Sequence, residues 1–323
     1  MNEPSSSFAS RLTPVAASYQ VPNLGLLRIA GRDAAKVTNG LCTANVIALP
    51  IGGVTEAFFT DDRGRVMVHA MVARDDDGVW IAGQIPEPGR LAAHIDRFIF
   101  REDATPRDVT QEWFAALVDG TETCSRLAVA ANVEKTALAA LGLGHLQIGE
   151  LAVTVMRLPI TDPDARLCFV PAADQDSLKH ALASAGFEAR ASADEFQSRR
   201  IANFWPVIGY EITERTLPQE LDRDALTISF TKGCYLGQET VARLDALGEV
   251  QKKLCLVRLS TAEPAAVGEP LLGDGKEVGK LTSVAPLMID GTRLALAHMR
   301  RGSFAPGSEF RLRNETGTVL HHG

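Results

Sequence analysis

The strongest constraint on the fold of this 323-residue chain is a change of sequence pattern at Gly248. After this residue, short aliphatic runs alternate with Gly, Pro and Asp, which is typical of strands joined by tight turns. The strand candidates lie at residues 254–259, 278–284, 294–297 and 310–312. They predict a small all-β module, a barrel or a sandwich, over residues 249–323.

Residues 1–248 mix strand and helix patterns and are too long for a single hydrophobic core, so two α+β subdomains are expected there. Apolar runs separated by Asp- and Gly-containing turns predict an antiparallel meander at residues 54–59, 65–72 and 79–82. Helix starts are predicted at Pro86 and Pro88, at Asp174, and at Ser192 with Glu195 in capping-box spacing. The predicted fold class is α+β with a C-terminal β-barrel domain.

Composition excludes several kinds of partner. The net charge is −7 with acidic and basic residues interspersed, so no basic stripe indicates nucleic-acid binding. No apolar run approaches the roughly 20 residues that span a bilayer. Residues 1–10 are polar and serine-rich, without the pattern of a secretory signal. We therefore expect a cytoplasmic protein that binds neither nucleic acid nor a membrane.

The cysteines are odd in number and widely spaced, at Cys42, Cys124, Cys168, Cys234 and Cys255. Without a Cys-x-x-Cys pair or a Cys/His cluster, neither a zinc site nor a four-cysteine cluster site is expected, and no metal site is predicted. A disulfide framework is also improbable in a chain of this size and compartment. Four of the five are expected to be small buried side chains.

Residues 232–243 are the segment in which chemistry is expected. Residues 226–230 predict a strand, and the apolar spacing from about Leu236 predicts a helix that Gly248 ends. Cys234 would then lie on a strand-to-helix turn, where free amides and Lys232 favour an anion such as a carboxylate or a thiolate. Equally, the turn could pack a helix on a strand with the cysteine buried and inert.

The glycines of this segment, Gly233 and Gly237, would let the backbone turn tightly and approach a ligand closely. Glu239 falls in the first turn of the predicted helix, where a carboxylate suits the helix dipole. Arg243 follows Glu239 by four residues, so an ion pair on the helix surface is available.

The run Lys-Gly-Cys-Tyr-x-Gly-Gln-Glu-x-x-x-Arg, which begins at Lys232, resembles the signature of the YgfZ/IBA57 family, relatives of the glycine-cleavage T-protein. The approach to it, through residues 217–220 and 228–230, also fits. Residues 38–41, 45–46 and 58–72 match more loosely, in the same order as in the family. The similarity therefore extends over most of the chain.

The resemblance implies a T-protein-like ring of three modules around a central opening that accepts a tetrahydrofolate. It also implies an accessory role in assembling or repairing iron–sulfur clusters, with client enzymes (radical-SAM proteins among them) or assembly proteins as partners. Cys234 would be the redox or thiol-exchange residue. The residues expected to contact the folate or hold its charge are Lys232, Tyr235, Gln238, Glu239, Arg243, Glu211 and Trp205.

The sequence departs from the T-protein pattern at the first meander. A carboxylate that assists one-carbon transfer in T-protein relatives is expected within residues 65–69, which contain no acid. His69 lies there, but a lone histidine on an alternating strand is more often a packed or surface side chain. Aminomethyl transfer is therefore disfavoured, and an enzymatic role is less favoured than an accessory one.

A second departure lies ahead of the signature, where the family reads Arg-Ile-Glu-Ala-Gly-x-Pro. Ala202 stands in place of the glutamate that faces the pterin's amino edge, and Phe204 in place of the glycine. A buried pterin edge without an acceptor would cost about 1–3 kcal/mol. The candidate replacements are Glu211, Glu220 and Asn203. Phe204 and Trp205 could stack on the ring or belong to the core.

Three functions are consistent with the sequence. The first is a folate-binding accessory protein for iron–sulfur clusters with a reactive Cys234. The second is a tetrahydrofolate-dependent one-carbon transferase or demethylase, which requires a carboxylate base in the folate pocket. The third is a scaffold that has lost its small-molecule site, as Ala202 and Phe204 suggest.

Overall fold

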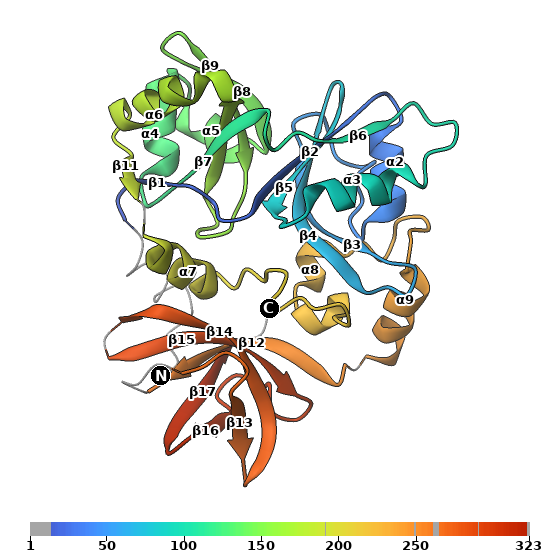
Figure 1. Cartoon of the computed structure of the whole chain (residues 1–323), viewed down its shortest axis with the longest axis vertical. Helices are drawn as coiled ribbons and strands as arrows, with labels where there is room; N and C mark the ends of the chain where they lie inside the picture. Colours follow the sequence, from blue (N-terminus) through green and yellow to red (C-terminus); the bar gives the residue numbers. More distant parts are fainter. Residues whose placement is uncertain (1–13, 191, 249, 261–264, 290, 322–323) are drawn as a thin grey trace.

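The computed structural model describes residues 14–190, 192–248, 250–260, 265–289 and 291–321. Two lobes of mixed helix and sheet lie side by side above a closed β-barrel, and short helices occupy the region between the three modules (Figure 1). The predicted α+β class and the C-terminal barrel are confirmed. No helix among the described residues has the length and apolar character to cross a bilayer.

The first lobe is an antiparallel five-stranded sheet in the order β3-β4-β5-β2-β6, covered by two helices. Its elements are β2 (Leu24–Ala30), α2 (Ala34–Leu41), β3 (Val54–Thr60), β4 (Val66–Asp75), β5 (Gly78–Gln84), α3 (Pro88–Asp96) and β6 (Thr105–Asp108). The predicted meander is β3-β4-β5. Leu91 and Ile95 of α3 lie in a core with Leu27, Val72 and Ile81 of the sheet.

The second lobe is a six-stranded sheet in the order β11-β1-β7-β10-β9-β8. Its elements are β1 (Ala17–Tyr19), β7 (Trp113–Asp119), α4 (Thr123–Ala131), α5 (Lys135–Ala140), β8 (Leu143–Ile148), β9 (Leu151–Arg157), β10 (Arg166–Pro171), η1 (Ala172–Asp174), α6 (Gln175–Ser184) and β11 (Glu188–Arg190). One face of this sheet packs on the helices, and the other meets the first lobe through Trp80, Trp113 and Phe169. Because β1 precedes the first lobe in the chain, the two lobes interlock.

The barrel closes in the order β12-β15-β14-β13-β16-β17. Its strands are β12 (Lys252–Leu259), β13 (Pro270–Gly273), β14 (Lys276–Ile289), β15 (Thr292–Arg300), β16 (Glu309–Leu312) and β17 (Glu315–His321). β12, β14, β15 and β16 coincide with the predicted strands, whereas β13 and β17 carried no prediction. Closure leaves the sheet without a free edge.

The helix α7 (Ala193–Ala202) joins the second lobe to the barrel (Figure 1). The predicted cap is confirmed, because the Ser192 side chain accepts a hydrogen bond from the Glu195 amide. Arg199 donates to Asp119 of β7 at 2.6 Å, and its neighbour Arg200 donates to Ser283 of β14 at 2.8 Å. Two consecutive buried arginines therefore fix the helix to two different modules.

The chain between α7 and the barrel holds three short elements, η2 (Pro218–Leu221), α8 (Asp224–Thr227) and α9 (Gln238–Leu247). Phe204, in place of the family's glycine, has φ 55° just after α7 ends. A bulky residue in this left-handed region costs roughly 1–2 kcal/mol. Its ring is buried against the barrel with Ile201 and Leu256, so packing offsets the strain.

Candidate functional site

The segment that carries the signature forms an irregular loop, residues 228–237, between α8 and α9. The predicted strand at residues 226–230 is wrong, because α8 ends at Thr227 and Phe230 points into solvent. The predicted helix is confirmed as α9, which begins at Gln238 and ends at Gly248 in the left-handed conformation. Cys234 therefore lies on a loop between two helices, four residues before α9.

Lys232 fixes this motif loop to the first lobe. Its Nζ donates to three backbone carbonyls, those of Asn39 at 2.6 Å, Cys42 at 2.8 Å and Ala44 at 2.6 Å. Burial lowers the pKa of Lys232, and the Tyr235 ring covers the ammonium with 5.0 Å between Nζ and ring centroid. All three N–H groups are thus used within the protein. The expectation that Lys232 holds a ligand's charge or the thiolate is corrected to a role in positioning the loop.

The far end of the motif loop meets the turn between β3 and β4. The Leu236 amide donates to the Gly40 carbonyl, and the Leu236 carbonyl accepts from the Thr60 hydroxyl. Gly237 has φ 81°, and a Cβ built there would lie 2.6 Å from both the Asp61 carbonyl oxygen and the Gly64 Cα. Only glycine permits this approach, so the motif glycine serves contact between two backbones.

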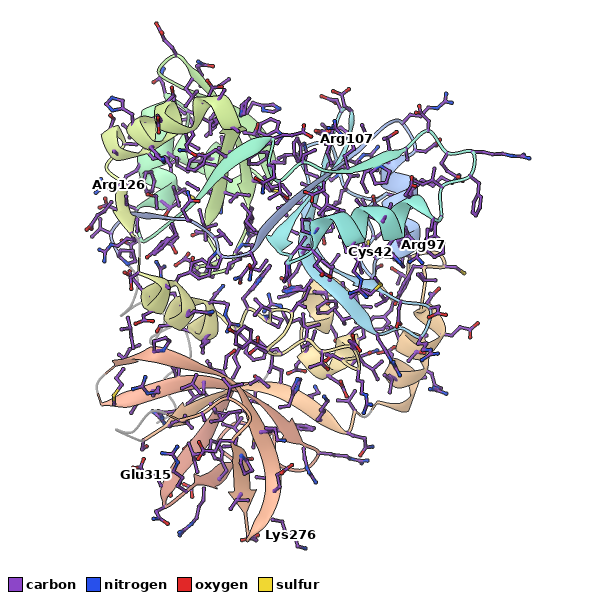
Figure 2. All side chains as sticks on the ribbon, viewed as in Figure 1. Cys42, Arg97, Arg107, Arg126, Lys276 and Glu315 are labelled. Carbon is purple, nitrogen blue, oxygen red and sulfur yellow. The ribbon has the colours of Figure 1, made fainter. Side chains whose placement is uncertain are left out.

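Cys234 is exposed, whereas Cys42, Cys124, Cys168 and Cys255 are buried as predicted. Burial raises the pKa of Cys42 to about 11 and those of Cys168 and Cys255 to about 12, which disfavours their thiolates. Figure 2 shows Cys42 within the first lobe. Among the described cysteines, Cys234 alone is exposed.

The other motif side chains are placed differently. Tyr235 is buried, and burial raises the pKa of its hydroxyl to about 12. Gln238 is half-buried, and Glu239 and Arg243 are exposed on α9. Glu239 and Arg243 form no ion pair with each other in the described structure, so that expectation is wrong. Both remain free to contact another molecule.

A cavity of about 760 Å³ lies on the other side of the same β3–β4 turn, between β4, the start of α3 and residues 208–214. It is lined by Asp61, Arg65, Val66, Met67, Val68, Ile85, Pro86, Glu87, Arg90, Leu91, Ile208, Gly209, Ile212, Thr213 and Glu214. The floor is aliphatic and the rim is charged. None of the predicted site residues lines this β4–α3 cavity, although Gly237 contacts Asp61 and Gly64 at its edge.

Trp205 and its neighbours form a buried ionic cluster among the described residues. Trp205 is fully buried. The centroid of its ring lies 4.2 Å from that of the His69 ring and 5.5 Å from the Arg223 guanidinium carbon. The His69 ring nitrogens contact the Glu56 carboxylate at 2.7 Å and the Pro206 carbonyl at 3.0 Å. Arg223 binds Glu56 through two nitrogens and donates to the Phe204 carbonyl at 2.9 Å.

This cluster corrects the prediction that Trp205 stacks on a ligand, because protein groups cover its ring. Burial would raise the pKa of Glu56, but the Arg223 guanidinium outweighs it and holds that pKa at about 2. Glu56 and Arg223 were not predicted from the sequence. The available signal was an acid inside an otherwise apolar strand, which requires a buried partner.

The predicted replacement acceptors for a pterin edge are also occupied. Glu211 is fully buried and accepts from the Val207 amide, from Arg200 and from the Ser283 hydroxyl. Asn203 donates to the Pro159 carbonyl at 2.7 Å. Glu220 accepts from the Leu217 amide and lies 3.5 Å from Lys252. These three residues join elements of the fold, so the expectation that Glu211 contacts the folate directly is corrected.

Two lobes that interlock above a closed barrel define the aminomethyltransferase class of fold. The crystal structure of the glycine cleavage system aminomethyltransferase T from Bartonella henselae has this fold, with a TM-score of 0.77 and 15% identity over 97% of this chain and 87% of that chain. The model of the GCVT N-terminal domain matches residues 13–231, so the chain belongs to this family.

Its relatives carry different names. It is 25% identical to the tRNA-modifying protein YgfZ of Klebsiella pneumoniae over 98% of this chain and 94% of the relative, which confirms the resemblance predicted from the motif. It is 21% identical to an aminomethyltransferase of Saccharopolyspora erythraea over 90% of this chain and 80% of the relative. It is 26% identical to a putative chloroplastic transferase of Arabidopsis thaliana, of which it spans only 60%.

Replacing Gly237 tests the backbone contact that places the motif loop. Gly237→Ala is expected to lower the free energy of unfolding by about 1–3 kcal/mol, because the new Cβ meets backbone at 2.6 Å and φ is positive. Gly233→Ala in the same loop meets no atom within 4 Å and should stay within about 0.5 kcal/mol. Urea denaturation measures both, and equal losses would contradict the assignment.

The Glu56 cluster predicts a specific dependence of stability on pH. A carboxyl whose pKa is lowered by folding stabilises the protein above its unfolded value and loses that contribution as the pH falls toward the folded value. The unfolding free energy of wild type minus that of Glu56→Gln should therefore be constant above about pH 5 and shrink between about pH 4.5 and 2. The lost contribution is on the order of 3 kcal/mol. Urea titrations at several pH values test this, with the exposed Glu239→Gln as control; a difference that grows on acidification would be the contrary result.

Proposed function

We propose that the chain is a folate-binding accessory protein, in which the exposed thiol of Cys234 acts on partner proteins in the maintenance of iron–sulfur clusters. The observation that carries the proposal is the arrangement of the motif loop. Lys232 and Gly237 hold this loop, in which Cys234 is exposed, and the far end of the loop touches the turn that borders the β4–α3 cavity. The proposed ligand cavity and the exposed Cys234 are thus connected through one turn and one loop.

The residues of the β4–α3 cavity fit a flat, partly apolar anion such as a reduced folate. A volume of about 760 Å³ suits a ligand of this size, and Val66, Val68 and Ile212 offer an apolar floor. Arg65 has no ion-pair partner among the described residues, so its guanidinium can receive the glutamate tail, together with Arg90. The carboxylates of Asp61 and Glu214 can accept from a pterin's amino edge.

The central cluster supports an accessory role over aminomethyl transfer. The strand that carries a carboxylate in T-protein relatives presents Val68 to the cavity and His69 to Glu56. Glu56, a buried acid on the neighbouring strand β3, does not line the cavity, and both its oxygens are bound by Arg223 and His69. Residues 65–69 of this strand therefore supply no carboxylate base, and the acids of the cavity, Asp61, Glu87 and Glu214, lie on other segments of its lining.

Cys234 has the accessibility that thiol exchange requires. In such an exchange, its thiolate attacks one sulfur of a client's disulfide, a mixed disulfide forms, and the client's other sulfur leaves as a thiolate. Cys234 is an exposed residue, which such an encounter with a client requires.

A titration with 5-formyltetrahydrofolate tests the ligand. Calorimetry is expected to show saturable binding, and Arg65→Gln or Arg90→Gln should each weaken it about tenfold by removing a charged contact to the tail. Arg63→Gln, on the same turn but outside the cavity, is the matched control. Absence of heat at high micromolar ligand, or equal affinities for all variants, would contradict this assignment.

Complementation tests the thiol. In a strain that lacks the gene, wild type is expected to restore the activity of iron–sulfur enzymes, whereas Cys234→Ser restores little of it despite normal abundance. Cys124→Ala, a buried change of similar size, should complement like wild type. Full rescue by Cys234→Ser would exclude a thiol mechanism while leaving folate binding untouched.

A further inference from the structure

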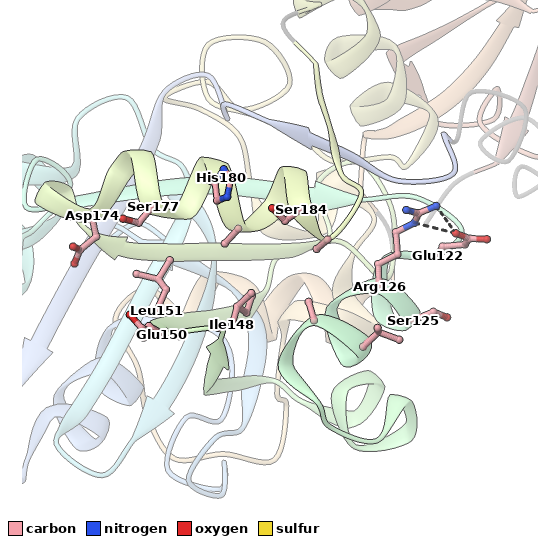
Figure 3. Close-up of a pocket in the computed structure, with 15 residues that line it drawn as sticks. Glu122, Ser125, Arg126, Ile148, Glu150, Leu151, Asp174, Ser177, His180 and Ser184 are labelled. Carbon is pink, nitrogen blue, oxygen red and sulfur yellow. Dashed lines mark hydrogen bonds and ion pairs between the residues drawn. The ribbon is translucent and has the colours of Figure 1, made fainter.

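A long groove lies on the helix-covered side of the second lobe, on the sheet face opposite the first lobe (Figure 3). Its volume is about 1080 Å³. α6 forms one side, and α4 together with the turn between β8 and β9 forms the other. None of the residues that the motif or the β4–α3 cavity uses takes part in it.

The shape of the groove suits an α-helix. α6 and its C-cap line it with four small side chains, Ser177, Ala181, Ser184 and Ala185, and with the larger His180, at the spacing of one helix face. Small residues let a second helix approach closely, and Ile148 and Leu151 supply an apolar floor. Val129 of α4 is 82% exposed although it belongs to a regular helix. The apolar surface of the groove therefore lies on regular helices and strands of the second lobe.

The two ends of the groove differ in charge. At one end, Glu150 and Asp174 lie near each other with no ion-pair partner in the described part of the chain (Figure 3). At the other end, Arg126 is neutralised by Glu122 at 2.8 Å and donates to the Gly186 carbonyl. The net character is acidic at one end and neutral at the other.

We propose that this groove receives an amphipathic helix of a partner protein, with a small apolar face and a lysine or arginine at the end that meets Glu150 and Asp174. Helix-in-groove docking uses this combination of an apolar stripe and terminal charge. A second copy of this chain is the poorer occupant, since two identical concave surfaces cannot fill each other about a two-fold axis.

The test uses the full-length protein and a labelled helical peptide of 14 residues, stapled, with a Leu/Ala stripe and two lysines at one end. Fluorescence anisotropy is expected to show saturable binding, which a peptide with serine in place of leucine lacks. Ala181→Trp fills the groove and should weaken binding at least about tenfold. Asp174→Lys should weaken it about fivefold at low salt and less at high salt. Asp176→Lys, two residues away on α6 and outside the groove, is the matched control.

Lack of saturable binding at millimolar peptide, or equal affinity for Ala181→Trp and wild type, would overturn the proposal. Dimerisation in sedimentation that Ala181→Trp abolishes would overturn it in favour of a second copy. The thermal unfolding midpoint of each variant shows whether it is folded. Because the groove and the β4–α3 cavity share no residue, folate titration of Ala181→Trp should match wild type, so this proposal and the proposed function fail independently.

Discussion

The ammonium group of Lys232, held by three backbone carbonyls, is the interaction on which the candidate site depends. Asn39 lies in the last turn of α2, where carbonyls lack partners inside the helix, and Cys42 and Ala44 follow in the connection to β3. A cation at this position satisfies all three and complements the negative end of the helix dipole. Lys232 thus caps α2 from 193 residues away, and this anchor fixes the loop two residues before the exposed Cys234.

The cluster around Trp205 shows how aromatic and charged side chains can be satisfied entirely within the protein. Trp205 occupies the space between His69 and Arg223, and the Glu56 carboxylate neutralises the guanidinium. Breaking such a buried pair by removing one partner costs about 3–5 kcal/mol, so the cluster is stable against displacement by a ligand. Under the proposed function, the ligand binds instead at the β4–α3 cavity, whose rim carries the exposed charged residues Glu87, Arg90 and Glu214.

Sequence patterns predicted the elements that local interactions determine. The meander, the Ser192 cap, the start of α9 and four barrel strands depend on alternation, capping and glycine signals within a few residues. The strand predicted at residues 226–230 failed because tertiary contacts override β propensity: the Ser229 amide pairs with the Thr43 carbonyl, outside any sheet. The roles of Lys232, Glu211 and Trp205 were also out of reach, since their partners lie in segments distant along the chain or in another module.

The contact between Gly237 and Gly64 determines how cavity and thiol can influence each other. Asp61 and Arg65, which line the cavity, belong to the turn that Gly237 touches, and Gly237 lies three residues from Cys234. Because two backbones meet without intervening side chains, a shift of the turn cannot be absorbed by a rotamer change and must move the motif loop. Under the proposed function, a ligand that restrains the turn would also restrain the thiol. Linkage makes the effect reciprocal, so a partner bound at Cys234 would alter the affinity for the ligand by the same factor.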